Sequence, residues 1–219
     1  MALQADGGRR RGAEMARIEP TLTVRGVAVW QGLLDPQAQR AVVEDVRGVV
    51  AAAPLFRPVT ARGKAMSVRM TSAGTMGWVS DRKGYRYEPR HPSGAPWPPI
   101  PETVLDVWLA VAPRARLPDC CLVNFYDGTA RMGLHQDRDE ADFTQPVVSV
   151  SLGDDALFRI GNAERGGRTE SVWLRSGDVM ALEGPARLLY HGVDRVRPGS
   201  STLLRDGGRI NLTLRVAGA

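Results

Sequence analysis

The sequence predicts a mainly β fold with flanking helices (α+β), in which a double-stranded β-helix, or jelly roll, forms the core. Three observations predict it: the first half contains two segments with helical periodicity, the second half contains short strand-like runs, and turn signals separate these runs. The chain has 219 residues, 43% of them hydrophobic, and this length can bury one core without disulfide bonds. We therefore expect a single folded domain over residues 21–219.

Residues 1–20 differ in composition from the rest of the chain. They contain the consecutive arginines Arg9, Arg10 and Arg11 and show no periodic apolar face, which predicts a flexible basic tail. The sequence has neither the apolar segment of a secretory signal nor an apolar run of about 18 residues. We therefore expect a cytoplasmic, monomeric protein without membrane contact. The formal net charge of +5 permits a nucleic-acid partner without requiring one.

Two helices are expected before the main run of strands. The first begins after the N-cap Asp35, with Pro36 as its first residue, and its apolar positions recur at helical spacing up to Pro54. The second spans residues 101–112, where apolar residues share one face. Residues 55–100 are rich in Gly, Pro, Arg and aromatic residues. This composition predicts short strands and loops.

The β core is expected over residues 119–217. Turn signals such as Pro198-Gly199 separate its short runs. The adjacent Cys120 and Cys121 begin the core and would point to opposite faces of a strand, which favours buried thiols over a disulfide. The predicted strands span residues 121–126, 147–152, 157–160, 171–174, 179–182, 187–190 and 209–216.

Two of the three histidines lie in positions that suit a metal centre. In an extended segment, residues two apart point the same way, so His135 and Asp137 can offer an imidazole and a carboxylate to one ion. His191, from a distant segment, would complete the two-histidine, one-carboxylate set that suits Fe(II). Because a His-x-Asp pattern is common by chance, ordinary surface or core histidines remain the alternative.

The last predicted strand alternates polar and apolar side chains. One face carries two arginines, and it is either a solvated outer face or the lining of the jelly roll. In a lining, both guanidiniums need carboxylate partners, and the dicarboxylate 2-oxoglutarate would satisfy them. The strand at 121–126 offers further polar contacts. The candidate residues are Asn124, Tyr126, Arg209, Asn211, Thr213 and Arg215.

Over residues 22–216 the chain resembles the AlkB family of Fe(II)- and 2-oxoglutarate-dependent dioxygenases, which repair alkylated nucleic-acid bases, and in particular its bacterial branch. The motifs that carry the resemblance include Gly77-Trp78, Gly84-Tyr85, Asn124-Phe125-Tyr126, His135-Gln136-Asp137-Arg138-Asp139-Glu140, Tyr190-His191-Gly192 and Arg209-x-Asn211-x-Thr213-x-Arg215. The resemblance implies that His135, Asp137 and His191 are catalytic iron ligands. It also implies that the six polar residues of the preceding paragraph hold 2-oxoglutarate, and that O2 is the other cosubstrate.

The resemblance implies a nucleotide-recognition lid over residues 55–100. A flipped base would stack between Trp78 and His135, and Asp139 would contact the polar edge of that base. The full set of implied substrate contacts is Met70, Trp78, Tyr85, Arg86, Tyr87, Asp139 and Arg165.

The chain departs from the family pattern at two positions. Lys64 replaces a lid tyrosine, which keeps a phosphate contact available but changes how the lid stacks on bases. Ile210 replaces a tyrosine between the first arginine and the asparagine of the last strand, where it points away from the ligand face.

The function implied by the resemblance is oxidative demethylation of 1-methyladenine and 3-methylcytosine in single-stranded or double-stranded DNA, with RNA as a further candidate. The products would be succinate, CO2, formaldehyde and the restored base. Two alternatives stay open at this point. One is a hydroxylase of a protein or small molecule that uses the same cofactors, and turnover of a methylated oligonucleotide would separate it. The other is a non-catalytic nucleic-acid binding module, which would consume no 2-oxoglutarate.

Overall fold

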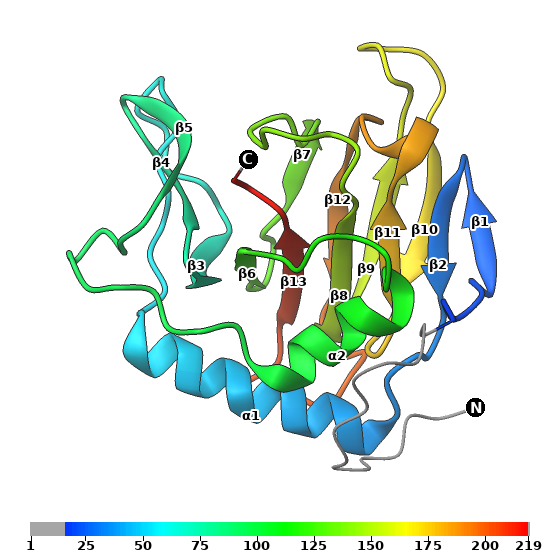
Figure 1. Cartoon of the computed structure of the whole chain (residues 1–219), viewed down its shortest axis with the longest axis horizontal. Helices are drawn as coiled ribbons and strands as arrows, with labels where there is room; N and C mark the ends of the chain where they lie inside the picture. The colour runs from blue at the N-terminus through cyan, green and yellow to red at the C-terminus, as the bar shows by residue number, and fades with distance from the viewer. Residues whose placement is uncertain (1–15, 219) are drawn as a thin grey trace.

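The computed structural model describes residues 16–218 and shows a jelly roll built from two facing sheets, with a hairpin at their open side (Figure 1). The main sheet has the strand order β1-β2-β11-β8-β13-β6-β3, and the minor sheet has the order β10-β9-β12-β7. Strands β4 and β5 pair only with each other. This architecture confirms the mainly β fold with flanking helices.

The element bounds agree with most of the predicted strands. The main sheet contains β1 (Leu22–Val24), β2 (Val27–Trp30), β3 (Arg69–Gly74), β6 (Cys120–Tyr126), β8 (Val147–Gly153), β11 (Val179–Leu182) and β13 (Arg209–Arg215). The minor sheet contains β7 (Met132–His135), β9 (Asp155–Ile160), β10 (Glu170–Leu174) and β12 (His191–Arg197), and the hairpin contains β4 (Gly77–Asp81) and β5 (Gly84–Glu88).

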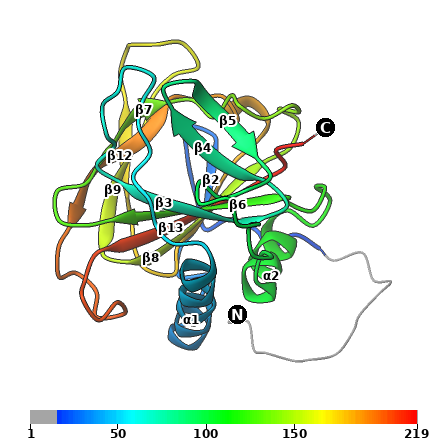
Figure 2. The same cartoon turned by 90° about the vertical axis from the view of Figure 1, so that its left-hand side faces the viewer.

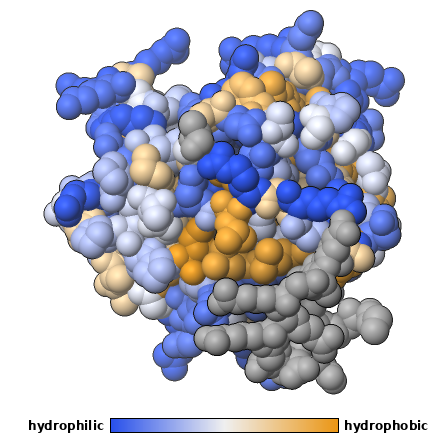
Figure 3. Space-filling view, viewed as in Figure 1, coloured by the Kyte–Doolittle hydropathy of each residue, from blue (hydrophilic) through white to orange (hydrophobic). Residues whose placement is uncertain are grey.

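Both predicted helices are present, as α1 (Pro36–Ala52) and α2 (Glu102–Val111). The Asp35 side chain caps α1 by accepting a hydrogen bond from the Ala38 amide at 2.8 Å. The two helices lie beneath the main sheet, on the side opposite the β4–β5 hairpin (Figure 2). On the face of the molecule drawn in Figure 3, hydrophilic residues form most of the rim and an apolar area lies at the level of the helices.

The strand alternation of β13 divides the molecule into a core and a site. Its apolar residues Leu212 and Leu214 are fully buried in one cluster with the apolar residues of both helices. Its polar residues therefore point to the other face, between the two sheets. The same division applies to β6, where Cys121 and Val123 belong to the helix-side cluster while Leu122 belongs to the cluster between the sheets.

One prediction about strands was wrong, and one strand of the main sheet lies in the region expected to form the lid. The strand expected at 187–190 is absent: a 3-10 turn, η1 (Gly184–Ala186), precedes this segment, and β12 begins only at His191. The turn starts at Gly184 with a φ of 48° and continues through Pro185, which favours a turn over a strand. Strand β3 lies in the region expected to form the lid, yet it pairs with β6 in the main sheet.

The expected end of the N-terminal tail also needs correction. The Trp30 indole donates a hydrogen bond to the Ile18 carbonyl at 2.8 Å, and the Ile18 amide bonds to the Ala110 carbonyl of α2 at 3.0 Å. Arg17 forms an ion pair with Glu183. Residues 17 and 18 thus pack on the domain, and residues 1–15 of the predicted tail lie outside the described residues. Neither helix in the described part of the chain has the length and apolar character to cross a membrane.

Candidate metal centre and cosubstrate site

A cavity of about 340 Å³ lies between the two sheets, beneath the β4–β5 hairpin. Its volume falls in the range of small-molecule sites. Its lining includes nine of the residues proposed from sequence to contact 2-oxoglutarate or a base, in addition to His135, Asp137 and His191. Most of these residues come from β6, β13 and the hairpin. The full set is Met70, Trp78, Tyr85, Asn124, Tyr126, Asp139, Asn211, Thr213 and Arg215.

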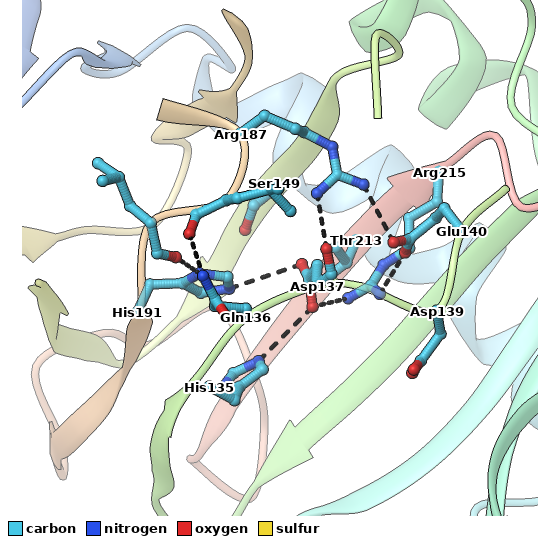
Figure 4. A network of polar contacts seen from close by, with 12 residues as sticks. His135, Gln136, Asp137, Asp139, Glu140, Ser149, Arg187, His191, Thr213 and Arg215 are labelled. Atoms are coloured by element: carbon cyan, nitrogen blue, oxygen red, sulfur yellow. Dashed lines mark hydrogen bonds and ion pairs between the residues drawn. The ribbon is translucent and has the colours of Figure 1, made fainter. Parts of the chain in front are cut away.

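The strand register brings the three metal-ligand candidates together. His135 at the end of β7 and His191 at the start of β12 are direct antiparallel partners, and Asp137 follows β7 by two residues. Asp137 Oδ1 lies 3.7 Å from His135 Nε2, and Asp137 Oδ2 lies 3.5 Å from His191 Nε2. One potential ligand atom from each residue lies within 4.8 Å of the others, which suits a single ion (Figure 4).

Backbone contacts orient both imidazoles for metal binding. His135 Nδ1 lies 2.9 Å from the Gly133 carbonyl, and His191 Nδ1 lies 2.9 Å from the Leu189 carbonyl. Because a carbonyl only accepts hydrogen bonds, each Nδ1 is the protonated nitrogen. Each Nε2 therefore offers a lone pair to the cavity, which is the usual arrangement of metal-binding histidines.

The electrostatics of the centre favour the ligand forms of these side chains. Burial, helped by the neighbouring His191, lowers the pKa of His135 and keeps it neutral. Burial opposes ionisation of Asp137, but Arg215 and the two histidines outweigh it and hold the pKa of Asp137 well below its usual range. Imidazole nitrogens and a carboxylate oxygen are ligands that suit Fe(II).

A buried ion-pair network surrounds Arg215. Its guanidinium donates to Asp137 Oδ1 at 3.0 Å and to Glu140 Oε1 at 2.8 Å. The second Glu140 oxygen accepts from Arg187 Nη2 at 3.0 Å. Sequence reasoning assigned no role to Glu140, although it belongs to the His135–Glu140 motif, and it missed Arg187, which no motif signals.

Tyr87 belongs to this network and does not line the cavity. Its hydroxyl donates to Glu140 Oε1 at 2.7 Å and lies 3.3 Å from Arg215 Nη1. Burial raises the pKa of Tyr87, so the hydroxyl stays protonated as a donor. The expected role of Tyr87 as a base contact is therefore corrected to a contact that joins the hairpin to Glu140.

Arg209, at the other end of β13, has a different environment. Its side chain is buried and donates to Ser151 Oγ at 2.7 Å, to the Asp154 carbonyl at 3.2 Å and to the Leu174 carbonyl at 3.4 Å. No carboxylate within the described range 16–218 forms an ion pair with it. Burial lowers its pKa to about 10, which leaves the group charged at neutral pH.

Several buried polar atoms at the site have no hydrogen-bond partner within the described part of the chain. They are Asn124 Oδ1, Asp137 Oδ2, Arg209 Nε and Arg215 Nε. Buried polar groups are normally satisfied, so orphaned atoms that cluster at one site indicate a missing ligand. Two guanidiniums with free donors fit a dicarboxylate, and a carboxylate oxygen next to two Nε2 atoms fits a metal ion. The residues therefore fit Fe(II) together with 2-oxoglutarate.

The cavity has one aromatic wall. The Trp78 and Tyr85 rings stack with their centroids 5.5 Å apart and an interplanar angle of 21°. Trp78 Nε1 donates to Asp139 Oδ2 at 2.9 Å, which fixes the indole and the carboxylate relative to each other. Half of Tyr85 remains exposed. Met70 lines the same cavity from β3.

Two of the implied substrate contacts, Arg86 and Arg165, do not line the cavity. Arg86 follows Tyr85 on β5, so it points to the opposite face, where it forms ion pairs with Asp81 and Glu88. Arg165 is exposed in the loop after β9 and is not among the cavity-lining residues. The third histidine, His91, is buried away from the metal centre, and its Nε2 lies 2.9 Å from the Pro54 carbonyl.

The chain is similar to known proteins in both sequence and fold. The family model of the 2OG-Fe(II) oxygenase superfamily matches residues 26–215. The "Alpha-ketoglutarate-dependent dioxygenase AlkB homolog" of Caulobacter vibrioides is 56% identical over 208 residues, which cover 94% of each chain. The "Alpha-ketoglutarate-dependent dioxygenase AlkB" of Escherichia coli is 39% identical over 186 residues, which cover 83% of this chain and 86% of the relative.

A solved structure shows the same fold. The structure described as "The structure of OsALKBH1" is 31% identical to this chain and superposes with a TM-score of 0.73. The match covers 89% of this chain and 100% of the other. The sequence matches, this fold and the His-Asp-His centre agree, and the chain belongs to the AlkB family of Fe(II)- and 2-oxoglutarate-dependent dioxygenases.

Proposed function

We propose that this dioxygenase removes methyl groups from ring nitrogens of nucleic-acid bases, with 1-methyladenine and 3-methylcytosine as its substrates. DNA is the proposed polymer, in single or double strands, and RNA is a further candidate. A flipped or unpaired base is required because the cavity is closed on most sides by the two sheets. We further propose that the enzyme acts as a monomer in the cytoplasm, where such a polymer is found.

The proposal assigns His135, Asp137 and His191 as the iron ligands. Arg209 and Arg215 would each hold one carboxylate of 2-oxoglutarate. Polar residues of β6 and β13 would complete this site. They are Asn124, Tyr126, Asn211 and Thr213. When bound, Fe(II) and 2-oxoglutarate supply the oxidation of a C–H bond by O2, with release of succinate and CO2.

The observation that carries the proposal is the pairing of the aromatic wall with Asp139. Alkylation of the ring nitrogen makes both proposed bases cationic, and a cation over an aromatic face is attracted by the ring. Because Trp78 Nε1 occupies Asp139 Oδ2, the other oxygen is left to accept from the exocyclic amino group that both bases carry. The aromatic wall would stack on the plane of the base, and Asp139 would accept a hydrogen bond from the polar edge of that base.

The protein's task after binding is limited to positioning and to excluding water. Oxidation of the N-methyl group gives a hydroxymethyl group on a ring nitrogen, and this hemiaminal releases formaldehyde and the restored base without further catalysis. Stacking between Trp78 and His135 would hold the methyl carbon over the metal centre. The hairpin would cover the base, since Trp78 and Tyr85 both lie on it.

The test is an aerobic incubation of the protein with Fe(II), ascorbate, 2-oxoglutarate and a single-stranded oligonucleotide that carries one 1-methyladenine. Mass spectrometry should detect loss of the methyl group together with an equal amount of succinate. The same oligonucleotide without the methyl group and the His135→Ala variant serve as controls. Succinate formation without demethylation would reject the nucleic-acid substrate while leaving the dioxygenase assignment intact.

A further inference from the structure

Arg187 is a buried arginine outside the roles assigned above. It lies between η1 and β12, four residues before His191, and only 3% of its side chain is exposed. A buried guanidinium is costly unless its charge and its donors are matched. Its acceptors therefore indicate what the residue is for.

All three hydrogen-bond acceptors of Arg187 lie on the segment that follows His135, the first of the two metal-ligand histidines. Nη1 donates to the Asp137 backbone carbonyl at 2.9 Å, Nη2 to Glu140 Oε2 at 3.0 Å, and Nε to the Gln145 carbonyl at 2.9 Å. Arg187 thus ties the segment that carries Asp137 to the segment that leads into His191. Figure 4 shows this guanidinium between the Asp137 backbone and Glu140.

The contact with Glu140 extends the influence of Arg187 to the cosubstrate side. Glu140 accepts from Arg187 with one oxygen and from Arg215 with the other. The two guanidiniums match the carboxylates of Asp137 and Glu140 in charge. Without Arg187, two buried carboxylates would share the single guanidinium of Arg215 next to the metal centre.

We propose that Arg187 is a positioning residue for the metal centre. It fixes Asp137 through the backbone carbonyl, and it fixes Arg215 through the carboxylate of Glu140. The inference rests on the iron centre that the family membership establishes and is independent of which base is demethylated. Groups that orient metal ligands from behind change metal affinity or activity by about 10- to 100-fold when removed.

The direct test is the binding of Mn(II) to metal-free protein, measured by isothermal titration calorimetry. Mn(II) replaces Fe(II) because it does not react with oxygen during the titration. In the Arg187→Met variant, Mn(II) affinity should fall by about 10- to 100-fold, and 2-oxoglutarate should bind more weakly to the Mn(II)-loaded protein. The matched control is Arg159→Met. Arg159 lies on β9 and forms one partly exposed ion pair with Asp194 of β12, so its loss should leave both affinities unchanged.

Melting temperature separates positioning from a purely structural role. A structural role alone would lower the melting temperature of Arg187→Met and leave the Mn(II) affinity of the folded protein unchanged, and this result would overturn the proposal. If Arg187→Met does not fold, Arg187→Lys decides, because lysine keeps the charge but cannot reproduce the planar set of three donors. We expect Arg187→Lys to fold and to bind Mn(II) several-fold more weakly than the wild type; wild-type affinity would overturn the proposal. Neither result depends on oligonucleotide turnover.

Discussion

The two ends of strand β13 each carry a buried arginine, but the two arginines contact different kinds of acceptor. Arg215 is already neutralised by Asp137 and Glu140, at 3.0 and 2.8 Å. Arg209 has only neutral acceptors, namely two backbone carbonyls and Ser151 Oγ. The first arginine is therefore part of the framework of the metal centre as well as a candidate ligand contact, whereas the second forms no ion pair with the described residues and is a candidate partner for a carboxylate of the ligand.

The difference separates a group that stabilises the fold from a group that is available to a ligand. A buried charge with a partner contributes to holding the structure, and a buried charge without one is a cost that a ligand can remove. Arg209 is therefore a better candidate than Arg215 for binding a carboxylate of 2-oxoglutarate. The following changes should separate stability from cosubstrate binding at the two ends.

The largest expected effect is on folding in Arg215→Met. This change leaves Asp137 without its guanidinium partner and Glu140 with Arg187 alone. Removing one partner of a buried ion pair typically costs about 3–5 kcal/mol. Urea unfolding of the metal-free protein should therefore show a free energy of unfolding lower by about this amount. A loss below about 1 kcal/mol would contradict the framework role of Arg215.

Arg209→Met should show the opposite pattern. The free energy of unfolding should change by less than about 1.5 kcal/mol, because no ion pair is lost and a costly buried charge is removed. The KM for 2-oxoglutarate should rise by about 10- to 150-fold, since a hydrogen bond between a charged group and the ligand contributes about 1.5–3 kcal/mol. Steady-state succinate production measures the KM. An unchanged KM would remove Arg209 from the cosubstrate site.

A change of pH should act on the Arg215 end first. Burial raises the pKa of Glu140, but Arg215, Tyr87 and Arg187 outweigh burial and lower it below its usual value. A carboxyl whose pKa is lowered in the folded state contributes stability above its unfolded pKa, of about 4.3, and that stability is lost as the pH falls through the folded value. The free energy of unfolding should therefore fall below about pH 4.3. Glu140→Gln should flatten this part of the pH profile, and an unchanged profile would exclude Glu140 as its source.

The two ends of β13 also show what the sequence can and cannot predict. Strict alternation placed both arginines on one face, and the spacing of His135 and Asp137 indicated a metal pair, because both patterns are local. The partners of Arg215 were not predictable in this way. Glu140 contacts Arg215, and Arg187 contacts Glu140, only because the turn before β12 folds against the segment after β7, and these contacts depend on long-range packing.

The same limit explains the errors in the hairpin region. Tyr87 alternates with Arg86 as expected, but its hydroxyl reaches a carboxylate 53 residues away in sequence and not the cavity. His91 is buried because the Pro54 carbonyl and the Phe56 and Trp97 rings surround it. None of these partners can be identified from the residues next to His91 in the sequence.

The smallest expected effect serves as a control on both arginine ends. Trp78→Phe keeps an aromatic ring in the wall but removes the hydrogen bond to Asp139 Oδ2. Losing one such bond to a charged acceptor at a partly exposed site should weaken binding by about 1–1.5 kcal/mol, or about 5- to 10-fold in the KM for a 1-methyladenine oligonucleotide. The KM for 2-oxoglutarate should stay at its wild-type value, because Trp78 contacts neither arginine, and the free energy of unfolding should fall by no more than about 1.5 kcal/mol. If the KM for 2-oxoglutarate rises as well, the hairpin and the cosubstrate site are coupled, and the Arg209 result could no longer be assigned to the loss of a carboxylate contact alone.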